Sequence, residues 1–206
     1  MNKSLAFLSA ALVLATPSLA SAASTVDLTV KGLITPSACT PSLSGSGMID
    51  HGKISAKDLV QNNPTVIGNH TLTMTVNCDA PITFGLHAID NRLGSALNGS
   101  NYGLGLINGT QKIGSYSLIL QNPVADSVAV QPITSGDYGT TWSAERMWER
   151  GYYMSVGAMD DDTQPLAVKD LTMAVQVQTI IARADSLDLS NEVTIDGSAT
   201  LEVKYL

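Results

Sequence analysis

The chain has 206 residues and carries 18 acidic against 11 basic side chains, a formal net charge of −7. A chain this acidic has no basic stripe to neutralise phosphates, so we expect no nucleic-acid partner. The length is sufficient for one domain with a buried core and is short for two.

Residues 1–22 have the pattern of a cleaved signal peptide. A single lysine gives a positive start, residues 5–14 form an apolar run, and residues 20–22 (ASA) have the small side chains of a signal peptidase site. A membrane anchor is the alternative, and it fails because the run is too short to span a bilayer and no later run is long enough. We expect cleavage after Ala22 or Ala23 and export. Loss of the lysine leaves 10 basic against 18 acidic side chains, a net charge of −8.

After the leader, apolar and polar side chains alternate with period two in several segments. Such alternation is typical of strands with one buried and one solvated face. In chain order, the apolar positions of these predicted strands are Val26, Leu28 and Val30; Leu72, Met74 and Val76; Ile82, Phe84, Leu86 and Ala88; Met173, Val175 and Val177; and Ala199, Leu201, Val203 and Tyr205. Further strands are predicted for residues 112–121, 127–131 and 152–159.

Turn signals separate these segments. Asn98-Gly99 and Asn108-Gly109 are favoured tight-turn dipeptides, and Asp196-Gly197 precedes the last predicted strand. Only residues 143–150 have a helical pattern, and this helix would be too short to form a core element. Many short strands with almost no helix predict an all-β sandwich.

Cys39 and Cys78 are the only cysteines. An even count in an exported chain favours a disulfide, and neither cysteine lies in a metal-type CxxC motif or beside clustered histidines. The bond would close a loop of about 40 residues and contribute roughly 4 kcal/mol in the chain-entropy model. A reactive thiol is the alternative.

The sequence contains no constellation typical of catalysis. His51, His70 and His87 lie on separate segments, and we expect His87 to be solvated because it is on the face opposite the apolar residues of its strand. No HxH, HExxH or GxSxG motif is present. We therefore expect no enzyme, no metal and no cofactor.

Two other groups of residues are candidates for binding. The run Asp160-Asp161-Asp162 offers oxygens to Ca²⁺ but lacks the spacing of an EF-hand, so we expect an exposed turn. Trp142 and Trp148 form either a sugar-stacking platform or, as we expect, a hydrophobic cluster under a loop.

The order of several features resembles the subunits of chaperone–usher pili, and more narrowly the beta-fimbrial major subunits. These features are the leader, the sequence TVKGLITPSAC near the mature N-terminus, a second cysteine that ends the strand TLTMTVNC, and a last strand ending in VKYL. The resemblance covers essentially the whole chain after the leader. Its most specific parts are the cysteine placement and the penultimate Tyr205.

The resemblance implies an incomplete immunoglobulin-like sandwich that lacks its last strand. Residues 23–35 would be the N-terminal donor strand and first strand, and residues 36–206 the sandwich domain. A periplasmic chaperone would fill the open groove with one of its own strands. At the outer-membrane usher, the donor strand of the next copy would replace it, which gives a head-to-tail polymer on the cell surface.

The resemblance also assigns site residues. The donor side chains would be Val26, Leu28, Val30, Gly32 and Ile34. The acceptor edge, which the chaperone also grips, would be formed by Ala199, Leu201, Val203, Tyr205 and the terminal carboxylate of Leu206. Many such subunits carry a glycine where this chain has Val193, and few residues precede Val26, so the donor register stays open.

We therefore expect a structural subunit of a fimbria that serves cell adhesion or biofilm formation. The alternatives are a tip or minor adhesin and a free periplasmic β-sandwich that binds a small ligand. A two-domain adhesin carries a lectin domain ahead of the pilin domain, and this length leaves no room for one.

Overall fold

The computed structural model describes residues 28–32 and 38–206. The predicted signal peptide and the predicted donor residues Val26 and Ile34 lie outside the described residues. Residues 28–32 have no regular secondary structure, and the side chains of Leu28 and Val30 are 88% and 87% exposed. No helix among the described residues is both long and apolar enough to cross a membrane.

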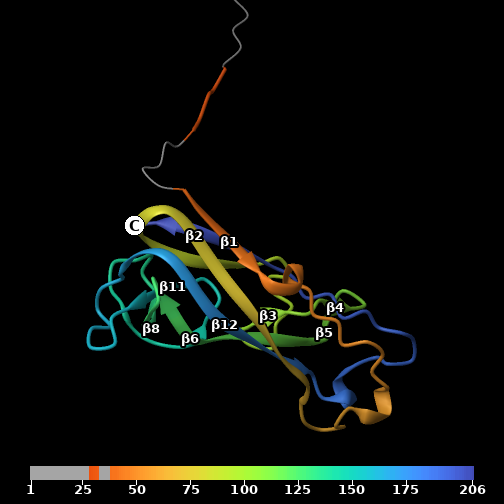
Figure 1. Ribbon diagram of the computed structural model, residues 1–206. Helices are drawn as coiled ribbons and strands as arrows, with labels where there is room; N and C mark the ends of the chain where they lie inside the picture. The colour runs from red at the N-terminus through yellow and green to blue at the C-terminus, as the bar shows by residue number, and fades with distance from the viewer. Residues whose placement is uncertain (1–27, 33–37) are drawn as a thin grey trace, which may run out of the picture. The chain divides into compact units, whose positions relative to one another are not determined.

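Residues 38–206 form an all-β fold, as predicted (Figure 1). The strands are β1 (Cys39–Leu43), β2 (Thr65–Asp90), β3 (Tyr102–Gly103), β4 (Leu106–Ile107), β5 (Gln111–Lys112), β6 (Gly114–Ala125), β7 (Val128–Ala129), β8 (Gln131–Ser135), β9 (Ser143–Ala144), β10 (Met147–Trp148), β11 (Tyr153–Gly157), β12 (Ala167–Ile181) and β13 (Ala199–Tyr205). The helical elements of this part are three short 3-10 turns, η1 (Ser44–Gly47), η2 (Ala56–Asp58) and η3 (Ala184–Ser186).

The long strand β2 belongs to both layers of the sandwich. Residues 65–83 pair with β12, and residues 74–78 pair with β1 on the other side. Residues 84–90 pair with β13, and Leu86 and His87 also pair with β11. Beyond β12 the first layer continues to β6, and beyond β11 the second layer continues to β8 and β9.

The sequence predicted two strands where the structure has the single strand β2. The apolar residues of both predicted strands have even numbers, and Cys78 keeps this parity between them, so one strand buries them all on one face. The pairing with β12 skips residues 78–81, where Pro81 offers no hydrogen-bond donor. The strand therefore continues through an interruption that looks like a strand end in the sequence.

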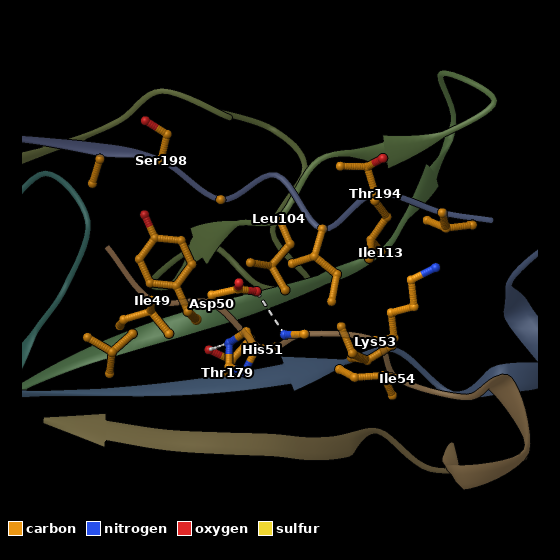
Figure 2. A pocket seen from close by; sticks show the side chains of 18 of the residues that line it. Ile49, Asp50, His51, Lys53, Ile54, Leu104, Ile113, Thr179, Thr194 and Ser198 are labelled. Atoms are coloured by element: carbon orange, nitrogen blue, oxygen red, sulfur yellow. Dashed lines mark hydrogen bonds between the residues drawn. The ribbon is translucent and has the colours of Figure 1, made fainter. Parts of the chain in front are cut away.

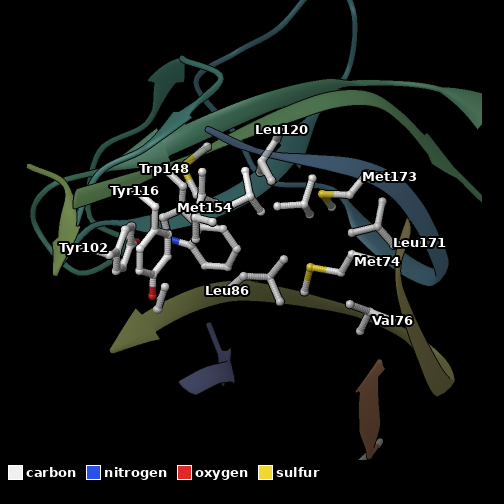
Figure 3. Close-up of a cluster of buried hydrophobic side chains, with 14 of the residues drawn as sticks. Met74, Val76, Leu86, Tyr102, Tyr116, Leu120, Trp148, Met154, Leu171 and Met173 are labelled. Carbon is white, nitrogen blue, oxygen red and sulfur yellow. The ribbon is translucent and has the colours of Figure 1, made fainter. Parts of the chain in front are cut away.

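One hydrophobic core fills the space between the two layers. Figure 3 shows part of it, with Leu86 and Met154 of one layer against Leu120 and Met173 of the other. The largest fully buried side chains are Trp148, Tyr102, Phe84, Met74, Leu86, Leu120, Ile133, Met154, Leu171 and Met173. The fold is thus a β-sandwich, and its two sheets do not close into a barrel.

The helix predicted for residues 143–150 is wrong. This segment contains the two-residue strands β9 and β10, and Met147 and Trp148 pair with Ile119 and Leu118 of β6. Trp148 is only 1% exposed. Burial of this large ring in the core outweighs the weak local preference for a helical turn.

Candidate functional site: an apolar groove between two strand edges

β1 and β13 are edge strands on the same side of the sandwich. Each pairs with β2 alone, so the outer side of each carries no strand among the described residues. The backbone N–H of Cys39 donates a hydrogen bond to the hydroxyl of Tyr205 over 2.9 Å, which joins the start of β1 to the end of β13. Unpaired edges of this kind are ready to accept a further strand.

The predicted disulfide is present and fixes β1. Cys39 and Cys78 are bonded, and they are direct cross-strand partners in the β1–β2 ladder. Because β1 has only five residues and pairs only with β2 within the described part of the chain, this bond ties the edge strand to the body of the sandwich.

A pocket of about 770 Å³ opens where β1 and β13 have separated. Leu43 of β1 and Ala199 and Leu201 of β13 line it, whereas Cys39, Val203 and Tyr205, at the joined end, do not. The floor consists of core side chains, which are Leu104, Ile113, Tyr116, Leu118, Val175, Val177 and Ile181. The pocket is therefore a groove whose floor is part of the hydrophobic core.

One side of the groove is the β13 wall, residues 187–201. Most of the odd-numbered residues of this wall that line the pocket are apolar: Leu187, Leu189, Val193, Ile195, Ala199 and Leu201. The polar Glu192, Thr194 and Ser198 line it as well. The alternation of β13 thus extends well before the strand itself. Residues 191–195 make no backbone hydrogen bond within the part of the chain that the structure describes. This stretch has the side-chain pattern of a strand but lacks a partner.

The other side is the β1 wall, residues 47–59, which lies across the pocket from Thr194 and Ser198 (Figure 2). His51 Nε2 lies 3.1 Å from the hydroxyl of Thr179 on β12. Among the described residues, this is the only hydrogen bond that joins residues 49–54 to another element. The His51 and His70 rings also meet edge to face, with their centroids 5.0 Å apart.

Acidification is expected to loosen the β1 wall. Burial, followed by the nearby His70, holds the pKa of His51 below its usual value of 6.5, although Asp50 opposes this shift. The folded chain therefore favours neutral His51, and this stability is fully present above pH 6.5 and is lost as the pH falls through the lowered folded pKa. Urea midpoints followed from about pH 7.5 to about pH 5 should fall more for the natural chain than for His51→Asn.

Four of the five predicted acceptor residues, Ala199, Leu201, Val203 and Tyr205, lie on one face of β13, and Leu206 follows the end of the strand. Ala199, Leu201 and Val203 are half-buried and pack against the core. Leu206 is 48% exposed, and its N–H donates to the carbonyl of Thr83. Of the predicted set, only Ala199 and Leu201 line the pocket.

His87 is not the solvated residue that the sequence predicted. Its side chain is 21% exposed, its ring centroid lies 5.2 Å from that of Tyr153, and Nδ1 lies 3.8 Å from a carboxylate oxygen of Glu202. Gly85 explains the difference, because it has no side chain and the Tyr153 ring lies against it. The outer face of the sheet is thus covered here by an aromatic ring.

The other candidates take structural roles. Trp142 and Trp148 are 8% and 1% exposed, so their rings do not form an exposed sugar platform, and Trp148 belongs to the hydrophobic core. Asp161 accepts hydrogen bonds from Thr163 in an exposed turn, and Asp162 accepts one from the N–H of Ala144. No group of three or more potential metal ligands occurs among the described residues.

Comparison with known proteins adds relatives without a stated activity. Residues 28–102 match a family model described as "Protein of unknown function (DUF1120)". The chain is 27% identical to the "Uncharacterized protein YhcF" of Escherichia coli (strain K12), over 91% of this chain and 93% of that protein. It is also 27% identical to "Protein GltF" of the same strain, over 87% and 88% of the two chains. Both similarities cover most of this chain.

Proposed function

We propose that this chain is a structural subunit of a chaperone–usher fimbria, resembling the beta-fimbrial major subunits, which polymerises by donating an N-terminal strand to the groove of the next copy. The observation that carries the proposal is the groove itself, which is floored by core side chains and opens between β1 and β13, two strands that each pair with β2 alone among the described residues. The chain would pass through the periplasm with a chaperone, reach an outer-membrane usher and end on the cell surface.

The donor segment has the properties that such a groove requires. Leu28 and Val30 are almost fully exposed and share the parity of Val26. Burying an exposed leucine or valine stabilises a complex by roughly 1.5–3 kcal/mol per side chain. Each backbone hydrogen bond to an unpaired edge contributes about 1 kcal/mol more. A second copy therefore supplies what the groove lacks.

A small-ligand function is the second candidate, because the groove volume also falls in the range of ligand pockets. Polar groups of Asp50, His51, Lys53 and Glu192 line it alongside the apolar floor. The two functions differ in assembly state. A ligand-binding protein stays a monomer, whereas a fimbrial subunit forms a polymer.

Assembly of the purified mature chain tests the proposal. Residues 23–206 are expected to form fibres in electron micrographs and a ladder of oligomers on a gel run without boiling. Deletion of residues 23–30 should abolish both, because the groove then has no donor. A synthetic peptide of residues 23–34, added in excess to this deletion variant, should raise its melting temperature.

The matched control is the same peptide with Leu28→Asp and Val30→Asp, which should not raise the melting temperature. A mature chain that stays monomeric at high concentration, with an unchanged melting temperature in the presence of either peptide, would count against the fimbrial proposal and favour the ligand-binding alternative.

A further inference from the structure

The two ends of the gap between β1 and β13 are not equally open. At the end where Cys39 pairs with Cys78 of β2, the Cys39 N–H donates a hydrogen bond to the Tyr205 hydroxyl over 2.9 Å, and the pocket does not extend to Val203. At the other end, the pocket continues along the whole β13 wall to Leu187. An added strand therefore finds space beside residues 187–201 and little beside residues 203–205.

The backbone hydrogen bonds of the β13 wall also favour an added strand beside residues before β13 over one beside its end. Residues 199–205 already form one complete ladder with β2. Residues 191–195 have no backbone hydrogen bond within the described residues, although Val193 and Ile195 face the groove. Backbone N–H and C=O groups that have no partner and are partly shielded from water are stabilised most by hydrogen bonds to an added strand.

Glycine positions shape the wall. At Gly197 a Cβ would lie 2.8 Å from the Leu104 side chain and 3.0 Å from the Tyr116 ring. The backbone of the β13 wall therefore packs directly against these two side chains of the groove floor at this point. Gly197 is followed by the small Ala199 and preceded by the larger Ile195. Two facing strands pack well when large side chains on one lie opposite small ones on the other. The donor side chains Leu28, Val30 and Gly32 decrease in size along the segment, so they offer both large and small residues for this packing.

We infer that the donor segment of one copy binds beside residues 193–201 of the next, so that the unpaired stretch before β13 becomes a strand on binding and forms the main acceptor edge. The inference rests on the proposed function and moves the contact away from Val203 and Tyr205. It assigns Val193 and Ile195 as contact residues for Leu28 and Val30.

Engineered disulfides in the assembled polymer test this placement. Three variants each carry Val30→Cys together with Ile195→Cys, Ala199→Cys or Val203→Cys. Disulfides form only when the two Cα atoms come within about 7 Å. After oxidation of fibres, at least one of the 195 and 199 variants should give covalent oligomers in high yield that a reductant dissolves. The 203 variant should show only background.

The outcomes separate the two proposals. Fibres that cross-link through position 203, and through neither 195 nor 199, would overturn the placement while leaving the fimbrial function intact. If the natural chain and all three variants form no fibres, the fimbrial function fails and the placement fails with it. Circular dichroism of each unassembled variant shows whether a substitution has disturbed the fold.

Discussion

Leu28→Asp is expected to abolish polymer formation while leaving the fold of each subunit intact. In the groove, the aspartate would place a carboxylate over apolar core side chains, where an unpaired charge costs several kcal/mol. The change also removes roughly 1.5–3 kcal/mol of apolar burial. Together these effects lower the affinity for the groove by on the order of a thousandfold or more.

The subunit itself should tolerate this change. Leu28 is 88% exposed, and substitutions at such positions usually change the free energy of unfolding by less than about 0.5 kcal/mol. Electron microscopy and unboiled gels measure assembly, and urea unfolding measures the fold. Binding to the chaperone should be unchanged, because the chaperone fills the groove and not the donor segment.

Thr29→Asp is the matched control. It introduces the same charge one residue away, and in an extended donor strand the side chain of residue 29 points out of the groove. This variant should still form fibres. Normal fibres from Leu28→Asp, or equal loss of fibres in both variants, would contradict the donor assignment.

Much of the framework could be predicted from the sequence because it rests on local alternation. β13 occupies residues 199–205, as predicted, since its apolar and polar residues alternate without a break. The disulfide was also predicted, because Cys39 and Cys78 are the only cysteines of a chain with an export signal. Patterns of this kind need no knowledge of distant contacts.

The groove was predicted only in part. The alternation that gives β13 continues backward through Ile195, Val193 and Leu189, but Gly197 and the polar Asn191 interrupt it and hid the longer wall. The role of His51 could not be predicted, because its partner Thr179 lies 128 residues away in the chain. Such contacts arise from the packing of the layers and leave no local signal.

Reduction of the Cys39–Cys78 bond is expected to produce the largest loss of stability. The two cysteines are separated by 39 residues, and release of a loop of this length costs roughly 4 kcal/mol in the chain-entropy model. Typical domains are stable by only about 5–15 kcal/mol, so the reduced chain should be marginal. Urea unfolding with and without reductant measures the difference, and the double variant Cys39→Ser, Cys78→Ser should behave like the reduced natural chain.

The same bond should matter for assembly beyond its effect on stability. β1 pairs with β2 through one short ladder, and without the disulfide that ladder and a few hydrogen bonds of individual side chains hold this boundary of the groove in place. If the groove is the acceptor site, reduced subunits should lose donor-peptide binding at urea concentrations below those that unfold the rest of the sandwich. Loss of binding and unfolding at one common midpoint would show instead that β1 separates only when the whole domain unfolds. Reductant should change neither quantity in the double serine variant, which controls for effects unrelated to this bond.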